Sequence, residues 1–325
     1  MCIYHGGFEE DLHTGAVLSD SGENLACRIA RELDFDLLLT GHQHMPVESV
    51  RIGGTFAVQP PANAGRYLQV EAAVRDGGAE FSARLLPVGG HTNPTETTPS
   101  PAAVLPLEQA AQRWLDEPVG HLEQAIPPEE KLRAALHGSA VAALFNQVQL
   151  SHTGADISCT SLGNEPAGLA ASVTMRAITA AYLFSNTLVV LEITEEILRA
   201  LLERCASYFT LENGTPRVSD AFLAPKVEHY NYDFFAGISY QFDLRQPVGR
   251  RLTRLSRLDG TPLGPGPLRL CTSNYRATGT GGYDALRTCP VLWRGSVEMP
   301  ELVAEYVRAN SPVSLPCNGR MEAIW

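Results

Sequence analysis

Several features that mark particular protein classes are missing from this sequence of 325 residues. No unbroken apolar run approaches the roughly eighteen residues of a membrane span, so no membrane-spanning helix is expected. The seven cysteines include no Cys-x-x-Cys spacing, which argues against a structural zinc site built from thiolates. The first residues, Met-Cys-Ile-Tyr-His, are neither basic nor followed by a long apolar stretch, so no secretory signal is predicted. The sequence leaves the compartment unknown.

Positive charge is also scarce. The formal net charge is -11, which argues against a protein that binds nucleic acid along an extended backbone. A local pocket can still be positive on an acidic protein, so a small phosphorylated ligand is compatible with this charge. Hydrophobic residues make up 44% of the chain and charged residues 19%, which is typical of a globular protein with a sizeable core. The length favours two domains over one.

Short strands dominate the beginning of the chain. Residues 2–6 are typical of the end of a buried strand, and residues 35–39 form a second short apolar run. Residues 50–87 alternate between apolar and polar side chains, as several further strands would. With one helix between the first two strands, this order predicts an α/β layered domain in residues 1–90.

Two segments have the periodicity of amphipathic helices. Residues 21–33 form the first, with Ser21 as a candidate N-cap. Its apolar residues recur at four-residue spacing on one face, at Leu25, Ile29 and Leu33. Residues 194–209 form the second and clearer helix, with Thr194 as N-cap and two glutamates in the first turn.

A segment rich in Gly, Thr, Ser and Pro, residues 89–106, separates the two halves of the sequence. A helix-prone stretch, residues 107–116, follows it. We therefore predict a linker and a spacer helix in residues 91–120, and a second, mixed α/β domain in residues 121–325. The period-two pattern of residues 237–244 predicts one of its strands.

The stretch "LLLTGHQHMP", residues 37–46, places two histidines directly after a buried strand. Residues two apart in an extended segment point to the same side, so His42 and His44 are expected to face one region. His5, at the end of a nearby strand, could join them. Three imidazoles at the ends of strands are a plausible part of a transition-metal site. For any single histidine, a hydrogen bond to a turn is the simpler interpretation.

Here the sequence resembles a known family. "YHGGFEEDLHTG" followed by "ENLACRIARELDFDLLLTGHQH" is similar to the last third of a dinuclear metallophosphoesterase domain. The resemblance implies that His5 and His42 are ligands of one metal ion and that His44 is a ligand of the other. It also implies that residues 1–90 are a truncated metallophosphoesterase α/β sandwich.

The metal site is incomplete by comparison with that family. The family also uses an early Asp-x-His, a bridging Asp in Gly-Asp, and the motif Gly-Asn-His; no such motif precedes His5, and neither Gly-Asp nor Gly-Asn-His occurs anywhere. The resemblance therefore implies divalent metal ions (Zn, Mn or similar) in a full-length enzyme, bound weakly or not at all here. The missing motifs lead us to expect either a fragment of a longer protein or a product that has lost its catalytic half.

The second half carries a further resemblance. "TMRAITAAYLFSNTLVVLEITEEILRALLERCASYF", "YNYDFFAGISYQFDL" and "CTSNYRATGTGGYDAL" are similar to the C-terminal domain of the 5′-nucleotidase family. They resemble most the branch of 2′,3′-cyclic-nucleotide 2′-phosphodiesterase/3′-nucleotidases. In this family the domain binds the nucleoside, with the base held between two aromatic rings.

Carried over to this sequence, the resemblance implies Tyr232 as the first ring and Tyr275 as the second, with Asn186 as a candidate for hydrogen bonds to the ribose or the base edge. Stacking between aromatic rings contributes roughly 1–3 kcal/mol per base and tolerates different bases. Both tyrosines could instead be core residues with satisfied hydroxyls. Tyr230 is the residue that a two-residue alignment error would substitute for the first ring.

The leading hypothesis is the C-terminal portion of a metal-dependent nucleotide phosphohydrolase, with a nucleotide or nucleoside as its small-molecule partner. Such enzymes are commonly exported or located at the cell surface. A second hypothesis is a nucleoside- or nucleotide-binding module without catalysis, because the metal site is incomplete. A third is a domain that serves only as an interaction surface.

A truncated first domain is expected to expose apolar surface and strand edges. We therefore predict a homo-oligomer that forms through this face. Light scattering on the purified chain checks the prediction, and a monomer at micromolar concentration would contradict it.

Overall fold

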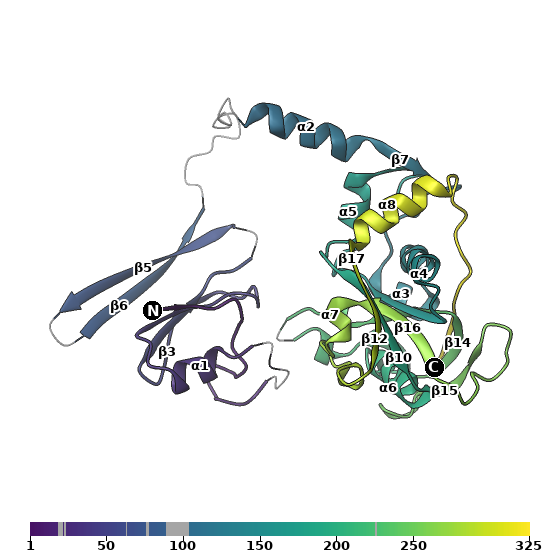
Figure 1. Ribbon diagram of the computed structural model, residues 1–325. Coiled ribbons are helices and arrows are strands. Elements are labelled where there is room, and N and C mark those ends of the chain that lie inside the picture. The colour runs from purple at the N-terminus through teal and green to yellow at the C-terminus, as the bar shows by residue number, and fades with distance from the viewer. Residues whose placement is uncertain (19–21, 23, 63, 76–77, 89–103, 225) are drawn as a thin grey trace. The chain divides into compact units, whose positions relative to one another are not determined.

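The computed structural model describes residues 1–18, 22, 24–62, 64–75, 78–88, 104–224 and 226–325 (Figure 1). The chain forms two compact units, Met1–Ser100 and Pro101–Trp325, which we call unit 1 and unit 2. Most of the predicted linker, residues 89–103, lies outside the described residues, and helix α2 (Leu105–Asp116) follows it. Within the described part of the chain, no helix is both long enough and apolar enough to span a membrane.

A four-stranded sheet in the order β1-β2-β4-β3 forms the centre of unit 1. Its strands are β1 (Cys2–Ile3), β2 (Leu37–Leu39), β3 (Val47–Ile52) and β4 (Thr55–Gln59). The first three strands of that order run parallel, and β3 is antiparallel to β4. Because β1 and β2 are parallel neighbours, the segments that follow them leave the sheet at the same edge.

Both faces of this sheet are partly covered. Helix α1 (Ala26–Glu32) packs on one face with Phe8, against Leu38 of β2. A long hairpin of β5 (Arg66–Arg75) and β6 (Gly78–Pro87) packs on the other face. There Phe81 stacks on Phe56, with 5.8 Å between the ring centroids.

Helix α1 differs from the helix predicted for residues 21–33. It begins at Ala26, and its buried residues are Ala26, Cys27 and Ala30 rather than the predicted stripe of leucine and isoleucine. The helix starts later than predicted because a residue distant in sequence caps its N-terminus. The carboxylate of Glu9 accepts hydrogen bonds from the backbone N–H groups of Cys27 (2.9 Å) and Arg28 (2.7 Å), so the helix starts where Glu9 lies. Ser21, the predicted N-cap, lies outside the described residues.

An open apolar cavity of about 740 Å³ borders the hairpin face of unit 1. It is lined mainly by side chains of β2, β4 and β5, among them Leu37, Leu39, Val58, Leu68 and Val70. Apolar surface of this kind is a common site of protein association. The self-association predicted from the sequence would use this surface, and it stays a prediction.

Unit 2 is built on a five-stranded sheet in the order β13-β8-β16-β10-β17. Its strands are β8 (Ile157–Ser161), β10 (Thr187–Ile193), β13 (Asp233–Ala236), β16 (Leu268–Ser273) and β17 (Val291–Glu298). Only β8 and β16 pair in parallel; the other pairs are antiparallel.

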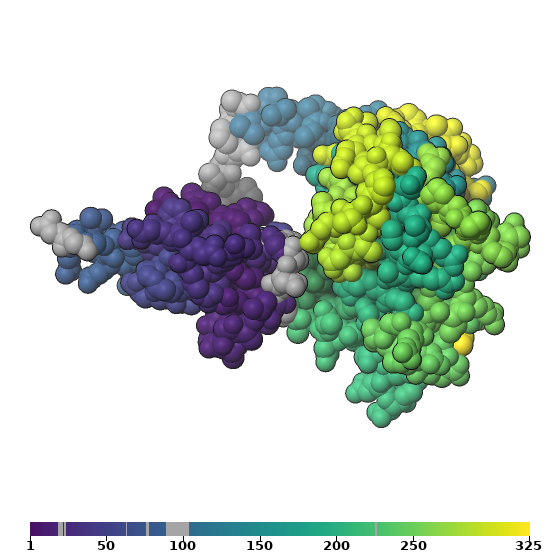
Figure 2. Space-filling view, turned by 60° about the horizontal axis from the view of Figure 1, so that its bottom comes forward, coloured from purple at the N-terminus to yellow at the C-terminus, as the bar shows by residue number. Residues whose placement is uncertain are grey.

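Helices cover this sheet on both faces. Helix α6 (Glu195–Ala206) packs on one face, and α4 (Ala140–Thr153), α5 (Met175–Ala181) and α8 (Met299–Ala309) pack on the other. Strand β10 shows why both faces are filled: Val189 contributes to the first core and Val190 to the second. Helix α8, yellow to yellow-green in Figure 2, lies at the outer surface of unit 2.

The helix predicted for residues 194–209 is confirmed as α6, with Thr194 as its N-cap. The Thr194 hydroxyl accepts a hydrogen bond from the backbone N–H of Ile197 (3.3 Å). The helix ends at Ala206, three residues before the predicted end, because Phe209 begins a hairpin. The remaining elements of unit 2 are α3 (Lys131–His137), β7 (Pro118–His121), β9 (Ser172–Thr174), β11 (Phe209–Glu212), β12 (Thr215–Val218), α7 (Asn274–Ala277) and the single turns η1 (Asp220–Phe222), η2 (His229–Asn231) and η3 (Asp284–Leu286).

Gly237 joins the five-stranded sheet to a second sheet. Directly after β13, the chain continues as β14 (Ile238–Asp243), which pairs with β15 (Leu252–Arg257) and β18 (Arg320–Ile324). Gly237 has φ +88°, and a Cβ atom there would lie 2.2 Å from the carbonyl oxygen of Asp156, so only glycine fits. The strand predicted for residues 237–244 is therefore confirmed as β14, and it is buried on both faces rather than on alternate residues.

Candidate functional site

Two of the three candidate metal ligands lie together in unit 1. His5 follows β1 and His42 follows β2, and their rings are 5.4 Å apart between centroids at an interplanar angle of 73°. The parallel pairing of β1 with β2 causes this, because it brings both strand ends to one edge. His44 is exposed. Both His42 (φ +71°) and His44 (φ +60°) have left-handed backbone conformations, which cost of order 1–3 kcal/mol each and are typical of functional turns.

Gln43, between these two histidines, ties their turn to the segment after His5. Its side-chain amide forms two hydrogen bonds with the backbone of Phe8: Nε2 donates to the carbonyl and Oε1 accepts from the N–H, both at 2.8 Å. The backbone N–H of Gly41 also donates to the carbonyl of Gly6 (3.2 Å). A Cβ atom at Gly7 would lie 2.1 Å from Gln43, so this close approach requires glycine. These contacts hold the turn that carries His42 and His44 against the segment that follows His5.

The residues present fit part of a metal site. Neighbouring imidazoles suit zinc and related ions. Among the described residues, however, no group of three His, Cys, Asp or Glu side chains is arranged to hold a metal ion. His5 and His42 can therefore supply adjacent ligands, and further ligands would have to come from elsewhere.

Two of the three candidate nucleoside-binding residues of unit 2, Asn186 and Tyr275, lie at one end of the five-stranded sheet. Leu188, at the start of β10, pairs with Ser273, at the end of β16, so the loop before β10 and helix α7 are neighbours. The side chain of Asn274 accepts a hydrogen bond from the backbone N–H of Thr187 (3.2 Å) and joins them directly. Asn186 lies in this loop and Tyr275 lies on α7, and both are half-buried.

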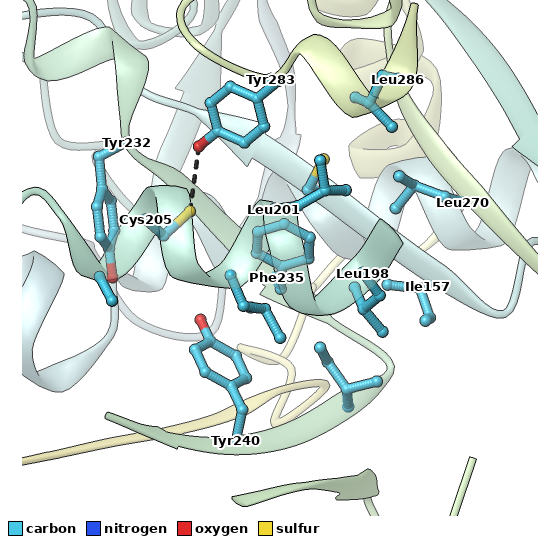
Figure 3. Close-up of a cluster of buried hydrophobic side chains, with 14 of the residues drawn as sticks. Ile157, Leu198, Leu201, Cys205, Tyr232, Phe235, Tyr240, Leu270, Tyr283 and Leu286 are labelled. Carbon is cyan, nitrogen blue, oxygen red and sulfur yellow. Dashed lines mark hydrogen bonds between the residues drawn. The ribbon is translucent and has the colours of Figure 1, made fainter. Parts of the chain in front are cut away.

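Tyr232 does not lie at this surface. It is 3% exposed, and its hydroxyl donates to the backbone carbonyl of Ala135 (3.0 Å). Its ring packs against Tyr208 and Phe234, with 5.0 Å between ring centroids in each case. Burial raises the pKa of Tyr232 well above its ordinary value. Figure 3 shows it among buried side chains near Cys205, so the structure favours the interpretation of Tyr232 as a core residue.

Two other aromatic residues occupy the end of the sheet instead. Phe184, in the loop before β10, and Tyr230, in η2, are half-buried, and their ring centroids are 6.4 Å apart. Apolar side chains flank them: Leu183 is 60% exposed and Val227 is 42% exposed. The sequence held a signal for Phe184, since it lies two residues before Asn186 in the same motif. We call Phe184, Tyr230 and Tyr275 the aromatic cluster.

A buried ion pair lies behind the aromatic cluster. The guanidinium of Arg276, next to Tyr275, forms a two-pronged ion pair with the carboxylate of Asp233 at 2.9 and 3.0 Å. Both side chains are 2% exposed. Arg276 also donates to the backbone carbonyls of Tyr230 (2.9 Å) and Thr280 (2.7 Å).

The chain contains only two lysines, Lys131 and Lys226, and Lys226 lies beside the aromatic cluster. The ammonium nitrogen of Lys226 is 5.5 Å from the centroid of the Tyr230 ring, close enough for a cation–π contact. Lys131 donates a hydrogen bond to the carbonyl of Gly163. The next residue, Asn164, donates through its side chain to the carbonyl of Val227 (2.8 Å). The contact of Asn164 with Val227 ties down the segment that precedes Tyr230.

Part of unit 2 matches a known protein family. Residues 118–288 match the family model described as 5′-nucleotidase, C-terminal domain. The chain is 22% identical over 377 aligned residues to the 2′,3′-cyclic-nucleotide 2′-phosphodiesterase/3′-nucleotidase of Haemophilus influenzae, covering 96% of this chain and 56% of that protein. It is 27% identical over 139 residues to the trifunctional nucleotide phosphoesterase protein YfkN of Bacillus subtilis, covering 39% of this chain and 9% of that protein.

Solved structures with a similar fold also include nucleotidases. A putative 5′-nucleotidase from Staphylococcus aureus, in complex with alpha-ketoglutarate, superposes with a TM-score of 0.85 at 29% identity, covering 99% of this chain and 63% of that one. The NAD nucleotidase of Haemophilus influenzae shares the fold, with a TM-score of 0.52 at 14% identity over 90% of this chain and 63% of that one. The predicted fold class, α/β in both units with a 5′-nucleotidase C-terminal domain in unit 2, is confirmed by this likeness. The chain spans about half to two thirds of the relatives that it matches along its whole length.

The half-buried position of Lys131 predicts a pH dependence. Burial lowers the pKa of Lys131 to about 8, from an ordinary value of 10.5. Between these two values the unfolded chain binds more protons than the folded chain, so the free energy of unfolding should rise with pH across this window. Urea unfolding of the wild type and of Lys131→Met at several pH values measures this as a difference, in which other titrating groups cancel. Parallel pH profiles for the two proteins would contradict the prediction.

Proposed function

This chain belongs to the 5′-nucleotidase family through its C-terminal domain, and from that premise we propose that it acts as part of a metal-dependent nucleotide phosphohydrolase. Unit 2 binds the nucleoside part of the substrate, and unit 1 contributes ligands to the metal ions. The reaction is hydrolysis of a phosphate ester, of the 2′,3′-cyclic-nucleotide phosphodiesterase/3′-nucleotidase type or the 5′-nucleotidase type.

The observation that carries this proposal is the position of the aromatic cluster. Three half-buried aromatic side chains lie at one end of a rigid sheet, inside the segment that matches the family. A nucleobase has two apolar faces, and aromatic rings bind it without regard to base identity. We assign the stacking surface to Tyr275 and to Phe184, which lies in the loop next to helix α7. Tyr230 borders this surface.

Polar groups beside the cluster orient the nucleoside. Asn186 lies two residues after Phe184, and its backbone carbonyl accepts from the N–H of Met299 (2.9 Å), which fixes the loop. Its side-chain amide donates to the Tyr182 hydroxyl at 3.4 Å, a long contact that a ribose hydroxyl or a base edge could replace. This geometry supports the proposal that Asn186 forms hydrogen bonds to the ribose or the base edge.

The metal ions would be held partly by His5 and His42, with His44 as a further ligand. Divalent ions in such a site polarise the phosphate and lower the pKa of a bound water. This chain's contribution is to orient imidazoles: the Gln43 amide and the paired strands β1 and β2 hold the two turns that carry them. The position of His5 beside His42 supports this role.

A second function is a nucleoside- or nucleotide-binding module without catalysis. It is favoured by the sparse ligand set, because among the described residues only part of a metal site is assembled. The two proposals share the binding surface of unit 2 and differ in turnover. Incubation of the purified chain with Mn²⁺ or Zn²⁺ and 2′,3′-cyclic AMP or 3′-AMP separates them, since release of phosphate or of a nucleotide product excludes a pure binder.

Removal of either stacking ring should weaken nucleoside binding. Tyr275→Ala and Phe184→Ala are each expected to lose about 1–3 kcal/mol of adenosine binding, roughly 5- to 150-fold in Kd, because one face of the base becomes exposed to water. Isothermal titration calorimetry measures this.

The matched control is Tyr232→Phe, which keeps the ring and removes only the hydrogen bond to Ala135. It should lower stability by about 1–2 kcal/mol and leave adenosine affinity unchanged. Wild-type affinity in Tyr275→Ala would remove the support for stacking at this end of the sheet.

Zinc or manganese binding should depend on the paired histidines. We expect calorimetry with Zn²⁺ to detect a weak site in the wild type that is lost in His5→Ala and in His42→Ala, because each removes one of two adjacent ligands. His121, an exposed histidine of unit 2, provides the control: His121→Ala should bind as the wild type does. Equal zinc binding by all four proteins would contradict the assignment.

A further inference from the structure

We propose that Arg276 is the positioning residue of the aromatic cluster: its buried guanidinium fixes the placement of Tyr275 relative to Tyr230 and, through Tyr230, to Phe184. This inference rests on the proposed function, because it concerns the same binding surface. Arg276 has no contact with the ligand in this proposal. It acts through the backbone of the segments that carry the rings.

The guanidinium is fully satisfied by acceptors from separate segments. Arg276 Nε and Nη2 bind the two oxygens of Asp233 on β13. Nη2 also donates to the backbone carbonyl of Tyr230 in η2, at 2.9 Å. Nη1 donates to the carbonyl of Thr280 (2.7 Å) and to the side chain of Asn231 (3.4 Å). Five N–H groups thus meet five acceptors, which is the full capacity of an arginine.

These acceptors place Arg276 between the segments that bear the aromatic rings. Its own backbone belongs to α7, next to Tyr275. The Tyr230 carbonyl belongs to the turn that carries the second ring, and Phe184 contacts that ring at 6.4 Å between centroids. A shift of the guanidinium would therefore move α7 relative to η2, and with them the rings.

The site behind the cluster is closed to water, so the arginine has no alternative partner. Arg276 is 2% exposed, and its guanidinium carbon lies 4.1 Å from the centroid of the Tyr283 ring. Figure 3 shows Tyr283 directed into the core, where its hydroxyl contacts Cys205 at 3.1 Å. A lysine at this position would keep the charge, but it has one nitrogen and could not reach Asp233, Tyr230 and Thr280 at once.

The first test separates positioning from stability. Arg276→Lys is compared with Leu198→Ala, which removes a fully buried side chain of α6 that is part of the core and not of the aromatic cluster. Both variants should have lower urea midpoints than the wild type. Adenosine binding is measured by calorimetry at a temperature at which all three proteins are folded.

We expect Leu198→Ala to bind adenosine as the wild type does, and Arg276→Lys to bind it about tenfold more weakly or worse, because the rings are no longer preorganised. Wild-type affinity in folded Arg276→Lys overturns the proposal. If the wild-type protein binds no adenosine, the proposed function itself is contradicted. If the wild type binds and folded Arg276→Lys binds equally well, only the positioning role of Arg276 is contradicted.

A second pair of variants retains Arg276, so the proposal can still be tested if Arg276→Lys does not fold. Gly281 has φ +76°, and a Cβ atom there would lie 2.4 Å from Arg276 Nη1 and 2.2 Å from the Asn231 side-chain oxygen. Gly214, in the turn of the β11–β12 hairpin, has φ +77° and open space around it. Gly281→Ala and Gly214→Ala therefore share the backbone strain, and only the first displaces Arg276. Weaker adenosine binding in Gly281→Ala alone supports the proposal, and equal affinity in the two variants overturns it.

Discussion

The buried ion pair between Arg276 and Asp233 is the interaction on which the binding end of unit 2 depends. Moving two charges out of water costs several kcal/mol per ion, and the pair is tolerated only because backbone and side-chain oxygens meet every remaining N–H. Removing one partner of such a pair costs about 3–5 kcal/mol. The segments around it, α7, η2 and β13, are therefore held in one arrangement. The segments that carry Tyr230 and Tyr275 are thereby fixed to a buried ion pair.

Much of the fold follows from local pattern. Helix α6 was predictable because Thr194 and two glutamates mark its start, and the strands of unit 1 and β14 were predictable from short apolar or alternating runs. The proximity of His5 and His42 was also predictable, because each follows a short strand and such strands end together when they pair in parallel. The burial predicted for the first of these strands was wrong, since Ile3 of β1 is 76% exposed. Each of these features is stabilised by interactions between residues that are close along the chain or on neighbouring strands.

Other features depend on residues far apart in sequence, which a single sequence does not display. The start of α1 is set by Glu9, eighteen residues before Cys27 along the chain. The choice between Tyr230 and Tyr232 depends on the turn η2, which ends just before Tyr232 and directs its ring into the core while Tyr230 stays near the surface. Arg276 could not be assigned from the sequence either, because its acceptors come from 43 to 46 residues away as well as from its own loop.

The position of Gly237 between two sheets affects how unit 2 unfolds. One uninterrupted stretch of backbone forms β13 in the five-stranded sheet and β14 in the three-stranded sheet. Unfolding of either strand therefore displaces the strand that belongs to the other sheet. The contact of Gly237 with the carbonyl of Asp156 lies at the hinge between them. The two sheets should therefore melt as a single cooperative block, with their amide protons exchanging together rather than sheet by sheet.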